Sequence, residues 1–152
     1  MPGKSTDPIR EANMVYLEHV NIVVRDMQSA LDFYSAAFPH WKIRTRGSGD
    51  WYGTARNWVH FGDDYQYLAM SDNGQGENRD LKRHDLGLAH FAFVVENVEA
   101  LIKRMLDAGY EISIPLNEEP FRKNVYFIDP SGFEVEFVEY LSDLPEQRNL
   151  TG

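Results

Sequence analysis

The chain has 152 residues, of which 43% are hydrophobic and 26% are charged, and its formal net charge is −9. This composition is that of one globular domain and excludes a disordered chain. The sequence holds no cysteine, which excludes disulfide bonds and thiolate chemistry. The acidic balance argues against nucleic acid as a partner, and no apolar stretch approaches the roughly 20 residues of a membrane span. We therefore expect a cytoplasmic protein that binds neither nucleic acid nor membranes.

The first half of the chain predicts a strand, a capped helix and three further strands. Residues 16–25 alternate in hydrophobicity as a strand does, and Asp26 is a good N-cap for a helix over residues 27–38. Pro39 ends that helix. The strands expected after it lie at 41–45, 53–61 and 65–70, and the two glycines of 46–50 predict a loop there.

The second half predicts the same order of elements. A strand is expected over residues 88–95, Asn97 is the cap of a second helix, and Gly109 ends that helix. The strands expected after it lie at 110–114, 122–128 and 133–140, with a loop at 115–120.

The two halves are an internal repeat. One offset relates His19 to His90, Val24 to Val95 and the cap Asp26 to the cap Asn97, with no gap between them. Such agreement of strand, cap and helix is typical of a duplicated βαβββ unit. The repeat divides the chain into an arm at 1–14, a first module at 15–70, a linker at 71–86, a second module at 87–140 and a polar tail at 141–152.

A metal site is predicted from three side chains on strands. His19 and His90 occupy equivalent places in the two modules, on the strand face away from the apolar helix-packing side. Glu136 alternates with apolar residues on the last strand, which follows an Asp-Pro-Ser-Gly turn. Two imidazoles and one carboxylate suit a divalent transition metal and leave positions open for substrate and water. The negative net charge is compatible with such a cation.

These features together resemble the vicinal oxygen chelate superfamily, which includes glyoxalase I, fosfomycin-resistance proteins, extradiol dioxygenases and bleomycin-resistance proteins. The resemblance is carried by LEHVNIVVRDMQSALDFY, LAHFAFVV and FIDPSGFEVEF and spans residues 16–140. It implies an α+β fold, with two βαβββ modules forming a U-shaped mixed sheet around a cleft and the helices on the outside. It also implies a small-molecule substrate and a homodimer.

The resemblance assigns roles to the predicted site. It implies that His19, His90 and Glu136 hold a divalent ion (Zn, Ni, Co, Mn or Fe), and that Glu136 and Tyr126 are the catalytic residues. A fourth ligand position falls on Leu68 or Ala69, and neither binds metal. Gln66 could supply an amide oxygen there only if the strand register slipped.

Three functions are compatible with this pattern. The favoured one is a metal-dependent glyoxalase-like enzyme, a lyase or isomerase that acts as a Lewis-acid catalyst on a small oxygen-chelating substrate. An extradiol Fe(II) dioxygenase is the first alternative, although Gln66 stands where those enzymes place an acid/base histidine. A metal-free drug-binding protein similar to bleomycin-resistance proteins is the second. The use of glutathione stays open, because Val23 replaces the arginine that holds it in glyoxalase I.

Aromatic residues are concentrated in the first module and could line a pocket for a flat or apolar substrate. They are Trp51, Tyr52, Trp58, Tyr65 and Tyr67. By contrast, His60 lies between Val59 and Phe61 on a predicted strand, and we expect its role to be structural.

Overall fold

The structure is a computed structural model that describes residues 15–150, so the predicted arm at 1–14 lies outside the described residues. The elements of the first half are β1 (His19–Val23), α1 (Met27–Ala37), β2 (Lys42–Trp51), β3 (Thr54–Gly62) and β4 (Tyr67–Ser71). Those of the second half are β5 (Phe91–Val94), α2 (Val98–Asp107), β6 (Ile112–Glu119), β7 (Arg122–Ile128), β8 (Glu134–Tyr140) and α3 (Pro145–Arg148). None of the described helices is long and apolar enough to cross a membrane.

Each half forms a four-stranded mixed sheet with the same topology. The strand orders are β1-β4-β3-β2 and β5-β8-β7-β6. In each sheet the first and last strands of the half pair in parallel, and the remaining pairs are antiparallel. The prediction of an α+β fold built from two βαβββ modules is therefore confirmed.

Both predicted N-caps are confirmed, and they explain where the helices begin. The Asp26 carboxylate accepts a hydrogen bond from the backbone N–H of Ser29 at 2.9 Å. The Asn97 side-chain oxygen accepts one from the N–H of Ala100, also at 2.9 Å. Each bond satisfies one of the backbone donors that the first turn of a helix leaves without a partner.

Two segments predicted as loops are strands. Residues 46–50 belong to β2, where Gly47 lies opposite Trp58 of β3. A Cβ atom on Gly47 would lie 2.6 Å from the Trp58 ring, so the glycine is there because an indole packs on its backbone and not because the chain turns. Residues 115–119 likewise belong to β6, and the tail contains the short helix α3.

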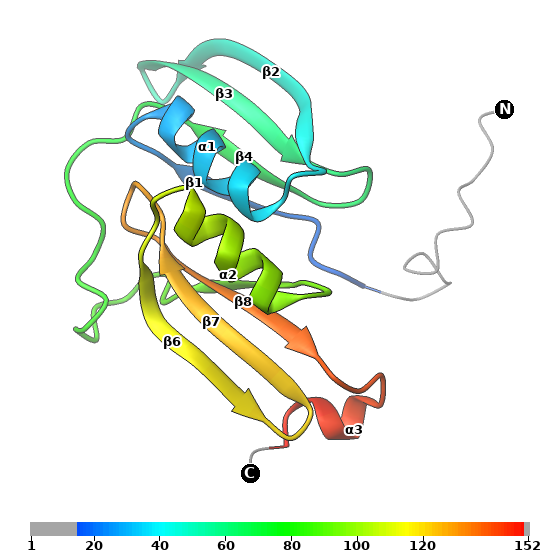
Figure 1. Ribbon diagram of the computed structural model, residues 1–152. Coiled ribbons are helices and arrows are strands. Elements are labelled where there is room, and N and C mark those ends of the chain that lie inside the picture. Colours follow the sequence, from blue (N-terminus) through cyan, green and yellow to red (C-terminus); the bar gives the residue numbers. More distant parts are fainter. Residues whose placement is uncertain (1–14, 151–152) are drawn as a thin grey trace, which may run out of the picture.

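The helices α1 and α2 lie side by side between the two sheets (Figure 1) and join them into one core. Their contact includes Arg104 of α2, whose guanidinium donates to the backbone carbonyls of Ala36 at 3.2 Å and Ala37 at 2.9 Å. These carbonyls belong to the last turn of α1, where acceptors lack helical partners and a cation is favourable. Each sheet therefore has one face covered by the helices, and we call the other its open face. The resemblance implied one U-shaped sheet with the helices outside, whereas this chain has two sheets with the helices between them, because α1 and α2 pack on each other in a shared core.

The turn between β7 and β8 also ties the modules together. Asp129 is 3% exposed and accepts a hydrogen bond from the hydroxyl of Tyr34 in α1 at 2.8 Å. Its other carboxylate oxygen accepts from the backbone N–H groups of Ser131 and Phe133. Gly132 completes the turn with φ of 90°, which a glycine adopts without strain. The predicted Asp-Pro-Ser-Gly turn is thus a junction between α1 and the second sheet.

Candidate active site

Three of the predicted site residues meet on the open face of the second sheet. His90 precedes β5, and its Nε2 lies 3.2 Å from Oε2 of Glu136 on β8. Tyr126 of β7 is the register partner of Glu136, and its ring packs edge-on against the His90 imidazole at 5.4 Å between centroids. Glu136 is 7% exposed, so the pair holds a buried carboxylate beside a half-exposed imidazole.

The electrostatics of this group keep the Tyr126 hydroxyl protonated. Its partial burial raises the pKa of Tyr126, and the charge of Glu136 and a hydrogen bond to that carboxylate raise it further. A phenol in this state donates a proton in a hydrogen bond to an oxygen. Tyr126 is therefore a hydrogen-bond donor positioned beside Glu136 and His90.

A fourth residue of the group, Asn124, was not predicted from the sequence. Its Nδ2 donates to Oε1 of Glu136 at 2.9 Å, and the residue is 4% exposed. The carboxylate only accepts, so this bond fixes the orientation of the amide, and Oδ1 is left buried without a partner. A signal was present in the sequence, because Asn124 lies two residues before Tyr126 and therefore on the same strand face.

His19 lies apart from this group. Its Nδ1 is 2.9 Å from Oε1 of Glu18, and its ring stacks on Tyr67 with centroids 4.7 Å apart. His19 and His90 nevertheless line the same cavity of about 420 Å³, between the beginnings of β1, β4 and β5. In the described part of the chain no three histidine, aspartate or glutamate side chains converge as a metal-binding group. The structure thus brings two of the three predicted ligands together and places the third on the wall of a shared cavity.

Strand register settles which residue stands at the fourth ligand position. Glu136 pairs with Ala92, two residues after His90, and Ala69 pairs with Asn21, two residues after His19. Ala69 is therefore the counterpart of Glu136 in the first module, whereas Leu68 belongs to the buried core. No register slip occurs in the pairing of β1 with β4, so Gln66 does not take this position.

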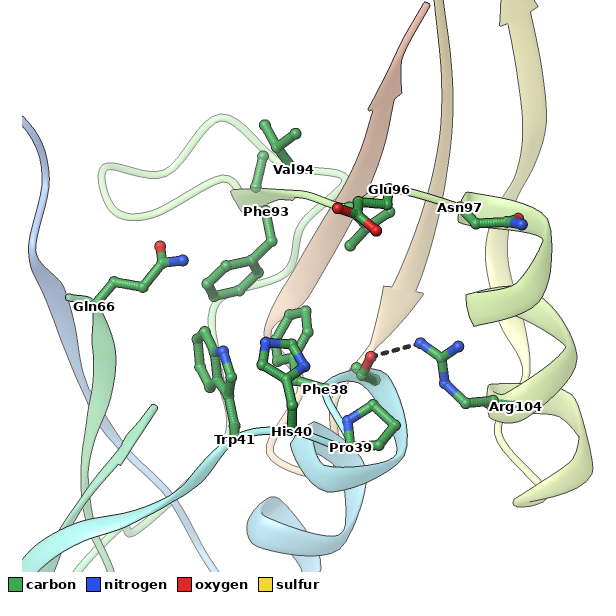
Figure 2. A pocket seen from close by; sticks show the side chains of 13 residues that line it. Phe38, Pro39, His40, Trp41, Gln66, Phe93, Val94, Glu96, Asn97 and Arg104 are labelled. Carbon is green, nitrogen blue, oxygen red and sulfur yellow. Dashed lines mark hydrogen bonds between the residues drawn. The ribbon is translucent and has the colours of Figure 1, made fainter. Parts of the chain in front are cut away.

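A larger cavity lies next to this site, but none of the predicted metal ligands lines it. It measures about 770 Å³ and is lined by the end of α1, β5 and the beginning of α2 (Figure 2). Figure 2 shows Phe93 and Trp41 on its wall, with Gln66 at one side and Glu96 and Asn97 at the other. The paired imidazole and carboxylate of His90 and Glu136 lie outside this larger cavity, and such a pair makes their surroundings the candidate site.

The donors present fit a divalent metal ion. An imidazole nitrogen and a carboxylate oxygen only 3.2 Å apart can bind one ion together, and a second imidazole faces the same cavity. The bond from Asn124 to the remaining oxygen of Glu136 is the kind of outer contact that orients a carboxylate ligand. His90, Glu136 and His19 would hold the ion, with open positions left for substrate.

Comparison with solved structures shows the same fold in several related proteins. A glyoxylase/bleomycin resistance protein/dioxygenase domain from Frankia sp. EAN1pec is 25% identical, with a TM-score of 0.69, covering 86% of this chain and 96% of its own. The fosfomycin resistance protein FosX from Mesorhizobium loti is 17% identical, with a TM-score of 0.60 and coverage of 87% and 95%. The trypanothione-dependent glyoxalase I of Leishmania major is 22% identical, with a TM-score of 0.62 and coverage of 82% and 86%.

The sequence itself matches a family model over most of its length. The matched residues, 16–137, include nearly all of both modules and all the predicted site residues. The resemblance seen in the sequence motifs is therefore confirmed: the chain belongs to the Glyoxalase/Bleomycin resistance protein/Dioxygenase superfamily.

Proposed function

We propose that this protein is a metal-dependent, glyoxalase-like enzyme that acts on a small substrate through two neighbouring oxygen atoms. His19, His90 and Glu136 hold the divalent ion, and Glu136 and Tyr126 are the catalytic residues. The observation that carries the proposal is the pairing of His90 with Glu136 at 3.2 Å, on the open face of the second sheet. Burying a carboxylate without a partner costs folding free energy, and a bound cation offsets that cost.

When bound, the ion supplies Lewis acidity to the substrate oxygens and stabilises negative charge that develops on them. The chain supplies the rest. Tyr126 donates a hydrogen bond to a substrate oxygen as charge appears there, because its hydroxyl stays protonated. Glu136 accepts a proton from the substrate, and Asn124 holds its Oε1 in place during that transfer.

Elemental analysis of protein purified without a histidine tag tests the metal site. We expect about one divalent ion per chain in the wild type and a loss of most of it in His90→Ala, since one of three ligands is removed. Iron would support the dioxygenase alternative, whereas zinc, nickel, cobalt or manganese would support lyase or isomerase chemistry. His84→Ala, in the linker, is the control and should keep the metal.

A metal-free binding protein is the second candidate, and one observation favours it. The third predicted ligand, His19, pairs with Glu18 and not with the His90–Glu136 pair. Wild-type protein that stays free of metal after loading with zinc, nickel, cobalt, manganese and iron in turn would contradict the enzyme proposal and favour this candidate.

A cytoplasmic location and a homodimer are part of the same proposal. β1 and β5 are edge strands, and on their open faces Val23 and Val94 are 39% and 67% exposed. Exposed apolar side chains along an edge strand are typical of a surface that a partner covers. We expect the wild type to sediment as a dimer and Val94→Asp to sediment as a monomer. Leu106→Asp, which changes an exposed leucine on α2, is expected to leave the dimer intact, and a monomeric wild type would contradict the proposal.

A further inference from the structure

The open face of the first sheet carries a row of neighbouring aromatic rings, of which the proposed metal site uses only His19. The Trp58 ring lies 5.1 Å from that of His60, His60 stacks on Tyr67 at 4.5 Å, and Tyr67 stacks on His19 at 4.7 Å. The row crosses from β3 over β4 to β1 and ends at a predicted metal ligand. His60, expected to be structural, is therefore part of the open face.

A cavity of about 340 Å³ lies at the other end of this row. We call it the Arg56 pocket; its lining residues are Asn21, Arg56, Trp58, His60, Ala69 and Met70. The Arg56 guanidinium donates to the Ser71 hydroxyl and lies over the Trp51 ring at 4.5 Å from its centroid. These two contacts hold the guanidinium in place beside the rings.

The repeat shows what opens the Arg56 pocket. In the second sheet Tyr126 pairs with Glu136, and in the first sheet the corresponding pair is His60 with Ala69. The first module thus has a methyl group where the second has its carboxylate. Gly47 opposite Trp58 leaves room for the indole that lines the pocket, since any side chain at Gly47 would collide with it.

Two guanidiniums lie beside the row of rings in a protein whose net charge is −9: Arg44 lies 4.6 Å from the centroid of the Tyr67 ring, and Arg56 lines the pocket with Trp58 and His60. Among the ion pairs within residues 15–150, none involves Arg56. Burial lowers the pKa of His60, and the nearby charges of His19, Arg44 and Arg56 lower it further while Glu18 opposes them. A guanidinium without a carboxylate partner, held among flat rings, is suited to an anion that carries a planar group.

We propose that the Arg56 pocket binds a planar, negatively charged part of the substrate, such as an arene carboxylate, with Arg56 on the anionic group and Trp58 and His60 against the ring. The two modules then have different tasks. The second sheet holds the reacting groups, and the first sheet recognises the substrate. This inference rests on the proposed function, because it takes the bound molecule to be the substrate of the enzyme. Binding to the Arg56 pocket itself requires no metal.

The test uses the full-length chain, freed of metal with EDTA and labelled with ¹⁵N, and two probes of one shape. 2-Naphthoate carries the charge, and 2-naphthalenemethanol does not. We expect 2-naphthoate to shift the NMR signal of the Trp58 indole N–H, which is assigned by its disappearance in Trp58→Phe. We also expect 2-naphthoate to bind at least about tenfold more tightly than the alcohol, because charge-assisted hydrogen bonds are stronger than neutral ones. In Arg56→Gln the preference for the acid should disappear.

Arg122→Gln is the matched control. Tyr126 and His60 occupy corresponding positions in the two sheets, and Arg122 lies four residues before Tyr126 just as Arg56 lies four residues before His60. Arg122→Gln should keep the preference for the acid. If both probes bind the wild type with equal affinity, that measurement alone overturns the proposal. It is also overturned if Arg122→Gln and not Arg56→Gln removes the preference, or if 2-naphthoate up to about 5 mM leaves the Trp58 signal unmoved. Loss of metal binding leaves all these results unchanged, so the two proposals fail separately.

Discussion

Glu136→Ala is expected to weaken the binding of zinc by at least about a hundredfold, because it removes the only anionic ligand of the proposed site. A carboxylate neutralises part of the ion's charge, and two imidazoles alone cannot replace that contribution. Isothermal titration of zinc into metal-free protein measures the effect. The same substitution leaves Asn124 without its acceptor, so the unfolding free energy of the variant should be measured beside the affinity.

Glu134→Ala is the control for this result. Glu134 is two residues before Glu136 on β8, and its carboxylate bonds the Ser113 hydroxyl at 3.2 Å and lies outside the His90 group. Its loss should leave zinc affinity within about twofold, since a half-buried charge that does not bind the ion directly is partly screened by solvent. Equal zinc affinity in wild type and Glu136→Ala would mean that the ion binds elsewhere or not specifically.

Asp129→Ala is expected to lower the unfolding free energy by about 2–4 kcal/mol, since three buried donors lose their acceptor. They are the Tyr34 hydroxyl and the N–H groups of Ser131 and Phe133. Burial raises the pKa of Asp129, because a charged carboxylate is costly to bury. Removing that carboxylate removes this cost, which offsets part of the lost stability. Urea unfolding followed by circular dichroism measures the change.

Two variants separate the contributions at this turn. Asp129→Asn keeps an acceptor for the backbone donors and should be the milder change. Tyr34→Phe removes only the hydrogen bond from the Tyr34 hydroxyl to Asp129 and should cost about 1–2 kcal/mol. If Asp129→Ala were as stable as the wild type, the turn would not be the junction that the structure indicates.

The two βαβββ modules can be predicted from the sequence, because their signals are local. Asp26 and Asn97 bond to the first turns of the helices that follow them, so a short stretch of chain is enough to predict them. Alternation along β8 placed Glu136 on the face away from Phe137 and Val135, and the repeat aligned His19 with His90. The local signal failed at Gly47, where a glycine that indicates a turn in isolation is instead covered by an indole from the neighbouring strand.

Only the tertiary structure decided which side chains share a site. Strand register brought Tyr126 and Asn124 to Glu136 and made Ala69 its counterpart, and register depends on pairing between distant segments. The packing of the first sheet also brought His60 into a row of rings beside Arg56. The face to which a side chain points follows from the alternation of residues along its own strand. Which side chains of different strands lie close together follows from how the strands pair, and that pairing is a property of the whole fold.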